Sequence, residues 1–292
     1  MIEFQSFCHE AMATEFEVVI AQEGIDHATA AHAAAAVFAE VDRLESELSR
    51  FKPTSDMWRL SLLAAGQSAV VDFAAWDCLS LAKAVHAETG GAFDITLGPL
   101  MRLWRNPDGS PRTPFPQELE MARQRMGMTL FDLDPDGLRV TVHADHMIFD
   151  LGAVGKGYAL DQAVRVLAEQ GIHTAFLSAG ESTLVALGDA PGETGWPVTL
   201  HLQEPRTMSL TGDALSCSGF GVQGNHIMDP RRLQPLPLQL PRTYVLAPTA
   251  ALSDALSTAF MVMSAEEVEA FCLRNPQVRA IGDGSVVFEA QA

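Results

Sequence analysis

Cysteine is scarce in this sequence and lacks metal-binding or redox spacing. The 292 residues include four cysteines, none of them in a Cys-x-x-Cys pair, so neither a zinc site nor a redox-active dithiol is expected. A disulfide framework is not expected either, because 48% of the residues are hydrophobic and a chain of this length can bury a substantial core. These features predict a reduced globular protein that is stabilised by packing.

Positive charge is also scarce. The chain has 19 Lys and Arg residues against 37 Asp and Glu residues, which gives a formal net charge of −18. Such a surface repels polyanions, so neither nucleic acid nor an anionic membrane is expected as a partner. An anionic ligand therefore has to be held by a local device, such as a helix N-terminus, one of the few lysines or a bound metal ion.

Long apolar runs are missing as well. No stretch of 18 consecutive apolar residues occurs, so membrane insertion is not expected. The opening residues, MIEFQSFCHEAMATEF, contain neither the basic segment nor the apolar segment of a secretory signal. This composition predicts a cytoplasmic location.

Two helices are indicated in the first third of the chain. A strand is predicted at 15–22, which is rich in β-forming residues. After Asp26, a suitable helix cap, apolar residues recur at helical spacing. This stripe consists of Val37, Val41, Leu44 and Leu48. A second helix is predicted at 74–89, with Gly90 and Gly91 as its C-terminal stop.

The rest of the chain mixes strands and helices. A hairpin is predicted around Pro135, Asp136 and Gly137, and the segment MIFDLG (147–152) is predicted to be a buried strand. Further helices are expected after Lys156 and at 251–264. Because no regular βαβ alternation occurs, the pattern favours an α+β fold in which mixed or antiparallel sheets pack with helices. One domain, 1–292, is expected, because no clean linker divides the chain.

The segment DLGAVGKGYALDQAV (150–164) has the elements of an anion site. Its glycines let backbone N–H groups approach a ligand, the following helix presents its positive end, and Lys156 adds a point charge. Asp150 has the chemistry to accept a hydrogen bond from a hydroxyl or a ring N–H. The spacing does not match a Walker A loop, and the same segment also fits a tight strand-to-helix turn with a solvated lysine.

Four further positions carry side chains suited to chemistry. Asp254 and Thr258 are four residues apart, so a helix directs both oxygens to one face, either as ligands of a hard cation or as helix-capping groups. His226, in a polar loop, is either a general base or simply exposed. Asp94 lies among apolar residues, where a carboxylate needs a ligand or a turn as its partner. Met12 has the flexibility to pack on a flat ring or to fill core.

The order and identity of these segments together resemble the FAD:protein FMN transferase family, the ApbE-type proteins. The resemblance covers nearly the whole chain, and the blocks at Asp94 and Asp150 are its most specific parts. The matching segments are MAT at Met12, LSRF at Leu48, GAFDITLGPL at Gly91, DLGAVGKGY at Asp150, CSG at Cys217, HIMDP at His226 and SDALSTA at Ser253.

The resemblance implies an ApbE/T-fold-like architecture with a flavin site between two layered units. It also implies that FAD is cleaved and that FMN is moved onto a Thr or Ser hydroxyl of an acceptor protein, with AMP released and Mg²⁺ required. His226 would be the catalytic base. The implied FAD-binding residues are Met12, Phe51, Ala92, Phe93, Asp94, Asp150, Lys156 and Ile227. The implied metal ligands are Asp254, Thr258 and the backbone carbonyls of Ala153 and Ser257.

The sequence departs from the family pattern at several matched positions. The family's residues there are, in order, Asn, Thr, Tyr and Gly, and this chain has Ser61, Cys217, Phe220 and Leu233. The change at Ser61 motivates one alternative to transfer, an FAD pyrophosphatase that uses water as the acceptor. A second alternative is a protein that binds FAD without turning it over.

Overall fold

The computed structural model describes residues 3–219, 227–237, 240–282 and 287–288. It divides into two compact units, each assembled from segments that are distant in sequence. Unit 1 contains Met1–Glu45, Val154–Gly219 and Pro241–Ala292, and unit 2 contains Ser46–Ala153 and Phe220–Leu240. That the chain folds as a single domain stays a prediction. Within the described residues, no helix is both long and apolar enough to cross a membrane.

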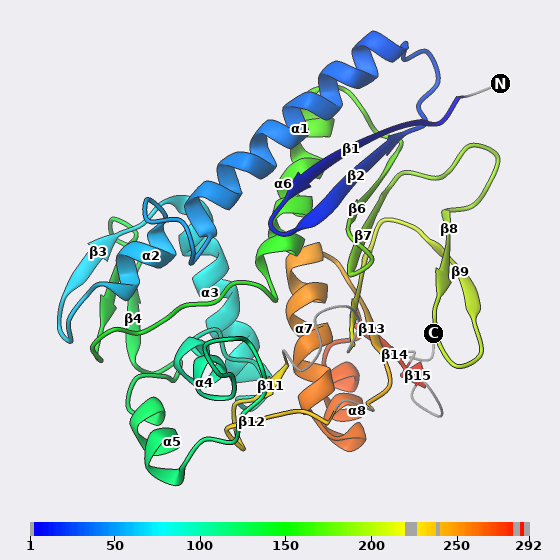
Figure 1. Cartoon of the computed structure of the whole chain (residues 1–292). Helices are drawn as coiled ribbons and strands as arrows, with labels where there is room; N and C mark the ends of the chain where they lie inside the picture. Colours follow the sequence, from blue (N-terminus) through cyan, green and yellow to red (C-terminus); the bar gives the residue numbers. More distant parts are fainter. Residues whose placement is uncertain (1–2, 220–226, 238–239, 283–286, 289–292) are drawn as a thin grey trace. The chain divides into compact units, whose positions relative to one another are not determined.

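An eight-stranded sheet forms the centre of unit 1, and every neighbouring pair of its strands is antiparallel (Figure 1). This confirms the predicted α+β class. In spatial order the strands are β1 (Gln5–Ala11), β2 (Thr14–Ile20), β6 (Ala175–Ala179), β7 (Thr183–Leu187), β10 (Ala214–Ser218), β13 (Thr243–Ala247), β14 (Arg279–Gly282) and β15 (Val287–Phe288).

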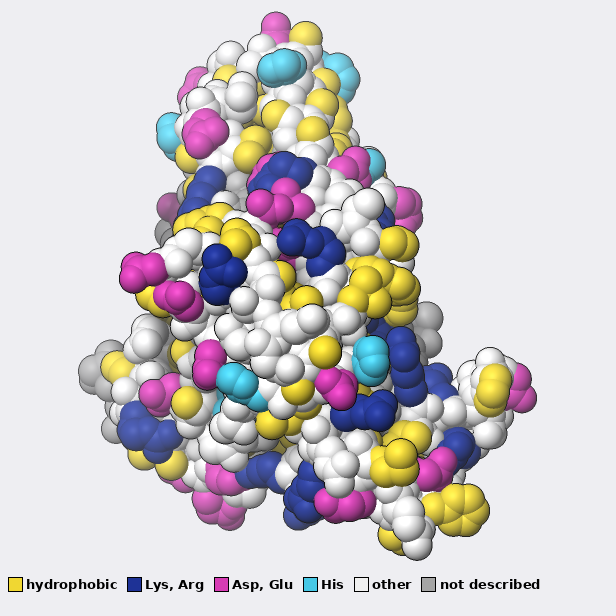
Figure 2. Space-filling model, turned by 90° about the vertical axis from the view of Figure 1, so that its left-hand side faces the viewer, with side chains coloured by type: hydrophobic (Ala, Val, Ile, Leu, Met, Phe, Trp, Pro, Cys, Tyr) yellow, Lys and Arg dark blue, Asp and Glu magenta, His cyan; other side chains and the backbone are white. Residues whose placement is uncertain are grey.

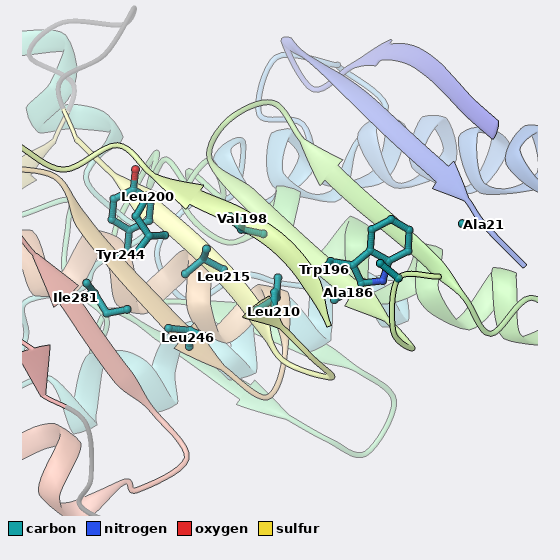
Figure 3. Close-up of a cluster of buried hydrophobic side chains, with 11 residues drawn as sticks. Ala21, Ala186, Trp196, Val198, Leu200, Leu210, Leu215, Tyr244, Leu246 and Ile281 are labelled. Carbon is teal, nitrogen blue, oxygen red and sulfur yellow. The ribbon is translucent and has the colours of Figure 1, made fainter. Parts of the chain in front are cut away.

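The two faces of this sheet are covered by different elements. In β10, Leu215 belongs to an apolar cluster shared with the hairpin β8 (Trp196–Leu200) and β9 (Arg206–Leu210), as Figure 3 shows. The next residue, Ser216, instead hydrogen-bonds Ser253 of helix α7 (Ala250–Val262) at 2.6 Å. Because successive side chains in a strand point to opposite faces, the β8–β9 hairpin covers one face and α7 the other.

Three further helices lie wholly or mostly in unit 1, and each begins or ends at a residue typical of helix termini. Helix α1 (His27–Leu48) begins after Asp26, whose carboxylate accepts the Thr29 N–H at 2.8 Å. Its predicted apolar stripe is buried, since none of the four side chains is more than 5% exposed. Helix α6 (Gly155–Glu169) is followed by Gly171 in the left-handed region, at φ 74°, and helix α8 (Ala265–Arg274) has a capping box at Ser264.

Unit 2 contains a three-stranded antiparallel sheet, a short two-stranded hairpin and four helices within its described residues. The strands of the sheet are, in order, β3 (Ser68–Val70), β5 (Arg139–Val142) and β4 (Phe131–Asp134), and the hairpin is β11 (Met228–Asp229) with β12 (Gln234–Pro235). The helices are α2 (Asp56–Ser61), α3 (Phe73–Glu88), α4 (Gly98–Leu103) and α5 (Pro116–Arg123).

Two sequence predictions in unit 2 have different outcomes. The hairpin at Pro135–Gly137 is confirmed, with β4 and β5 on either side of it. The buried strand predicted at 147–152 is wrong. Met147 and Phe149 are fully buried, but the segment joins no sheet, and its Asp150 N–H is bonded to the Ile95 carbonyl at 2.6 Å. An apolar run signals burial, whereas strand pairing depends on partners that are distant in sequence.

Candidate functional site

Lys156 and Asp254 form an ion pair in unit 1. Lys156 Nζ lies 3.8 Å from Asp254 Oδ2, and the Gly157 N–H is 3.3 Å from the same oxygen. Burial raises the pKa of Asp254, while the charge of Lys156 opposes that rise. Helix α6 begins at Gly155, so Lys156 lies within its first turn and not ahead of it as the sequence suggested. The positive end of α6 therefore already faces a carboxylate of the protein itself.

A chain of hydroxyl groups orients Thr258 on α7. The Ser257 hydroxyl donates to the Asp254 carbonyl at 2.9 Å, and Ser218 Oγ lies 2.8 Å from Ser257 Oγ and 3.2 Å from Thr258 Oγ1. Each hydroxyl has one proton. Ser257 has used its proton, so Ser218 donates to Ser257 and Thr258 donates to Ser218. The lone pairs of the Thr258 oxygen are thereby left to accept or to coordinate.

Helix α7 is held against α6 by a carboxylate and by a glycine. Asp161 on α6 accepts the N–H groups of Ala250 and Ala251, the first residues of α7, at 2.7 and 2.9 Å. Burial raises the pKa of Asp161, and these two backbone hydrogen bonds lower it. A Cβ on Gly157 would lie 2.2 Å from the Ala250 carbonyl oxygen. Asp161 and Gly157 therefore set the position of Asp254, one turn further along α7.

The donor atoms around Asp254 fit a hard cation such as Mg²⁺. The Asp254 carboxylate is only 4% exposed, and the groups near it on α7 are hydroxyl oxygens, which are the ligand type that Mg²⁺ prefers. Among the described residues, no group of three or more His, Cys, Asp or Glu side chains is arranged to hold a metal. An ion bound here would have one carboxylate from unit 1 and would need further oxygen ligands, such as those of a phosphate.

Met12 lies at the tip of the β1–β2 hairpin. Met12 and Ala13 form its two-residue turn, with φ values of 50° and 59°, the backbone of a type I′ turn. The Met12 N–H donates to Glu45 at 2.8 Å. The family that the sequence resembles has glycine at the Ala13 position and also at Leu233, where φ is 57°. Both substitutions therefore place a Cβ in the left-handed region, which glycine adopts with less strain.

Two predicted flavin-site aspartates lie on adjoining loops of unit 2. Asp94 Oδ1 accepts both the N–H and the hydroxyl of Thr96 at 2.6 Å, and burial raises the pKa of Asp94. Asp150 accepts the Gly152 N–H at 2.9 Å and lies 3.4 Å from Arg50 Nε. The backbone bond from Asp150 to Ile95 joins the two loops. Both aspartates are thus turn-forming groups that keep lone pairs for further partners.

The other predicted residues of unit 2 differ in accessibility. Phe51 is 74% exposed, and the Arg50 guanidinium lies 4.5 Å from the centre of its ring. Ala92, Phe93 and Ile227 are buried, at 2%, 2% and 4% exposed. Only a surface ring such as that of Phe51 can stack on a ligand directly, so the buried residues would act through the backbone. Ala153 is the last residue of the first segment of unit 2.

Two of the discussed residues, His226 and Phe220, lie outside the described residues. Cys217, which stands where the family has threonine, is described. Burial raises the pKa of its thiol to about 11, so it is an inert neighbour of Ser218. Sequence reasoning did not single out Ser218, Asp161 or Arg50. Ser218 and Arg50 lie inside matched segments, whereas Asp161 lies outside them, and the partners of Asp161 and Arg50 are distant in sequence.

The comparisons with known proteins agree on one family. The ApbE family model matches residues 12–281. The FAD:protein FMN transferase of Klebsiella pneumoniae is 31% identical over 264 residues, covering 84% of this chain and 75% of that protein. The protein of the same name from Salmonella typhimurium is 28% identical over 271 residues, with the same coverage of 84% and 75%.

Solved structures show the same architecture. The apo flavinyl transferase ApbE of Pseudomonas stutzeri has a TM-score of 0.85 at 26% identity, covering 99% of this chain and 93% of that one. The flavin transferase ApbE of Vibrio cholerae has a TM-score of 0.86 at 20% identity, covering 98% of this chain and 96% of that one. At this identity the similarity concerns the fold only. The fold and the named relatives together identify this protein as a transferase enzyme. The chain belongs to the ApbE family.

Proposed function

We propose that the protein transfers FMN from FAD to a Thr or Ser hydroxyl of an acceptor protein and releases AMP, with Mg²⁺ required. The observation that supports this most directly is the buried Asp254 beside Lys156, with the oriented Thr258 hydroxyl on the same helix. This arrangement suits a pyrophosphate with its metal ion. The related transferases are named for the flavin chemistry itself.

The reaction breaks one phosphoanhydride bond of FAD and forms one phosphoester bond to the acceptor. The acceptor oxygen forms a bond to the FMN phosphorus, the bond from that phosphorus to the bridging oxygen breaks, and AMP leaves with the bridging oxygen. Lys156 would hold the negative charge that grows on the phosphate oxygens. Asp254, Thr258 and the carbonyls of Ala153 and Ser257 would hold Mg²⁺, which supplies further charge neutralisation when it is bound.

A proton must leave the acceptor hydroxyl, because the neutral hydroxyl is a weak nucleophile. We assign this proton to His226, because histidine is the side chain most often used as a general base near neutral pH. Phe51, Asp94 and Asp150 would hold the flavin in unit 2, together with Met12 from unit 1 and the backbone around Ala92, Phe93 and Ile227. The cytoplasmic location stays a prediction.

The test compares FAD binding with the rate of FMN transfer in pairs of site and control variants. The protein is incubated with FAD, Mg²⁺ and a Thr-containing peptide, and flavin-labelled peptide and AMP are both measured. His226→Ala should retain FAD and lose about 10²–10⁴-fold in rate, whereas His32→Ala, at an exposed position on α1, should behave as the wild type. Asp254→Asn should lose activity and Mg²⁺ response together, whereas Asp136→Asn, in the exposed hairpin turn, should not.

Full turnover in His226→Ala would refute the base assignment, and an unchanged Mg²⁺ response in Asp254→Asn would refute the metal site. The pyrophosphatase alternative is tested by the same assay, because it predicts AMP release without any acceptor. The orientation of Ser61 is relevant to the pyrophosphatase alternative. Ser61, which replaces the family's Asn, donates its hydroxyl to the Trp58 carbonyl at 2.7 Å, so this side chain is turned to its own helix. Intact FAD with no Mg²⁺-dependent AMP would favour a binding protein.

A further inference from the structure

Helix α3 ends in a tight turn that leads directly into the 89–96 loop of unit 2. Gly90 adopts the left-handed conformation at φ 59°, and its N–H is bonded to the Ala87 carbonyl at 3.3 Å. The Gly91 N–H is bonded to the His86 carbonyl at 2.9 Å. These two bonds are those of a Schellman motif, a common way to end a helix at glycine. The backbone of His86 therefore fixes the start of the loop.

The side chain of His86 fixes the same loop a second time. Its Nδ1 lies 2.7 Å from the Phe93 carbonyl oxygen. Because a carbonyl oxygen only accepts hydrogen bonds, Nδ1 carries the proton and donates it. Figure 2 shows several histidines at the surface of the face that it presents, but His86 is only partly exposed. A side chain on α3 thus holds the carbonyl of the residue that precedes Asp94.

The 89–96 loop keeps backbone donors available for a ligand. The N–H groups of Phe93, Asp94 and Ile95 have no hydrogen-bond acceptor within the part of the chain that the structure describes. Phe93 and Ile95 are nevertheless only 2% exposed. Buried backbone N–H groups nearly always have a partner, and successive N–H groups are a common way to bind electronegative atoms of a ligand. The direction of these donors therefore matters for binding.

The bond from His86 sets the direction of one of these donors. The Phe93 carbonyl and the Asp94 N–H belong to the same peptide unit, which is planar and trans. In a trans unit the C=O and N–H bonds point in opposite directions. Because the His86 ring holds the carbonyl of this unit, the Asp94 N–H is directed away from the ring.

Contacts further along the loop do not replace the bond from His86. Asp94 Oδ1 accepts the N–H and the hydroxyl of Thr96, and Thr96 Oγ1 accepts the Gly127 N–H at 2.6 Å. These contacts hold the loop on the C-terminal side of the Phe93 carbonyl. The ring of His86 is the side chain that holds the carbonyl itself.

We propose that His86 is a positioning residue for flavin binding, whose ring holds the Phe93 carbonyl and thereby aims the open N–H groups of the 89–96 loop at the flavin. The inference rests on the proposed function, which assigns this loop to FAD. His86 itself needs no contact with the flavin, and it lies outside the matched segment that begins at Gly91. The proposed metal and phosphate groups belong to unit 1, so a change at His86 should alter FAD affinity and not the rate at saturating FAD.

A different role for His86 would be electrostatic. Burial raises the pKa of Asp94, the hydrogen bonds from Thr96 lower it, and the nearby His86 lowers it as well. Two substitutions separate the roles. His86→Asn keeps an N–H donor on Cγ, the atom that carries Nδ1 in histidine, but has no charge at any pH. His86→Leu removes both the donor and the charge.

The experiment measures FAD binding to the whole protein by flavin fluorescence in the presence of Mg²⁺. The wild type is compared with His86→Leu and His86→Asn. The same two changes at His143, an exposed histidine of unit 2 that pairs with Asp132, are the controls. Hydrogen exchange of the peptide that covers 92–97 is followed by mass spectrometry with and without FAD, because it reports on the loop N–H groups directly.

We expect His86→Leu to weaken FAD binding about three- to tenfold, the factor that corresponds to one hydrogen bond. His86→Asn should stay within about twofold of the wild type. In the transfer assay the KM for FAD should rise in His86→Leu while kcat is unchanged. FAD should slow hydrogen exchange of the loop in the wild type and in His86→Asn, and less so in His86→Leu.

Three results would overturn the proposal: unchanged FAD affinity in His86→Leu, equal losses in His86→Leu and His86→Asn, or losses of the same size in the His143 variants. If circular dichroism shows that His86→Leu does not fold, His86→Phe takes its place, because it keeps a ring of similar size without a donor. A lowered free energy of unfolding with normal FAD affinity would make His86 a purely structural residue and overturn its positioning role.

The same measurements separate this inference from the proposed function. Weaker FAD binding in His86→Leu with recovery in His86→Asn, in a protein that transfers no flavin, would refute the function and support the role of His86. Normal transfer with the same KM for FAD in all variants would overturn the role of His86 alone. A fall in kcat with an unchanged KM would place His86 in the chemical step and overturn the positioning role.

Discussion

Gly157→Ala tests whether the contact between α6 and α7 builds the metal and phosphate site. The new Cβ would lie 2.2 Å from the Ala250 carbonyl oxygen and 2.5 Å from its carbon. Both obstructing atoms are backbone atoms, so no side-chain rotation relieves the overlap. The two helices have to separate by roughly 1 Å, since ordinary contacts between non-bonded heavy atoms are about 3.5 Å.

The expected change in stability has two opposing parts. Alanine gains up to about 1 kcal/mol over glycine in a helix interior, whereas overpacking costs about 1–3 kcal/mol. Because the obstacle is backbone, the upper end applies, and the free energy of unfolding should fall by about 2 kcal/mol. The same movement lengthens the bond from the Gly157 N–H to Asp254, so binding of Mn²⁺, used as a probe for Mg²⁺, should weaken about tenfold or more.

Urea unfolding followed by circular dichroism measures the first change, and Mn²⁺ titration by electron paramagnetic resonance measures the second. Ala168→Gly, at an exposed position on the same helix, is the matched control. It should lose about 0.5–1 kcal/mol through helix propensity alone and leave Mn²⁺ binding unchanged. A Gly157→Ala protein that is more stable than the wild type would refute the close packing. A destabilised protein with normal Mn²⁺ affinity would refute the link from packing to the site.

Three further predictions concern other parts of unit 1. Ala13→Gly should raise the free energy of unfolding by up to about 1 kcal/mol in urea, because it relieves a left-handed alanine in the β1–β2 turn; a loss of stability would contradict the strain. Ser218→Ala should weaken Mn²⁺ binding about tenfold while FAD still binds, because Thr258 loses the acceptor that orients it; unchanged Mn²⁺ affinity would exclude this positioning role. Cys217, with a pKa of about 11, is about one part in a thousand thiolate at pH 8, so iodoacetamide should leave it unmodified at pH 8 and react increasingly as the pH rises toward 11, as read by mass spectrometry. Labelling of Cys217 at pH 8 as fast as that of exposed Cys8 would contradict the raised pKa of the Cys217 thiol.

Local chemistry in the sequence determined most of the elements of this fold. The apolar spacing from Val37 to Leu48 required a helix with one buried face, and the Pro-Asp-Gly turn required a hairpin. The matched segments at Asp94, Asp150 and Asp254 were likewise readable, because each is a short run of specific residues. These signals need no knowledge of the remainder of the chain, since backbone preference and side-chain periodicity act over a few residues.

Long-range contacts decided the rest. The segment 147–152 looked like a strand, yet it is buried without pairing, because burial is visible in composition and a pairing partner is not. Asp254 accepts a hydrogen bond from the Gly157 N–H, which is 97 residues away in sequence. Asp161 accepts one from the Ala250 N–H at the start of α7, across a similar separation in sequence. Only the folded chain brings such groups within hydrogen-bond distance, and a hydrogen bond acts over about 3 Å whatever the separation in sequence. The candidate residues could therefore be named from the sequence, whereas their orientation depends on how α6, α7 and β10 pack.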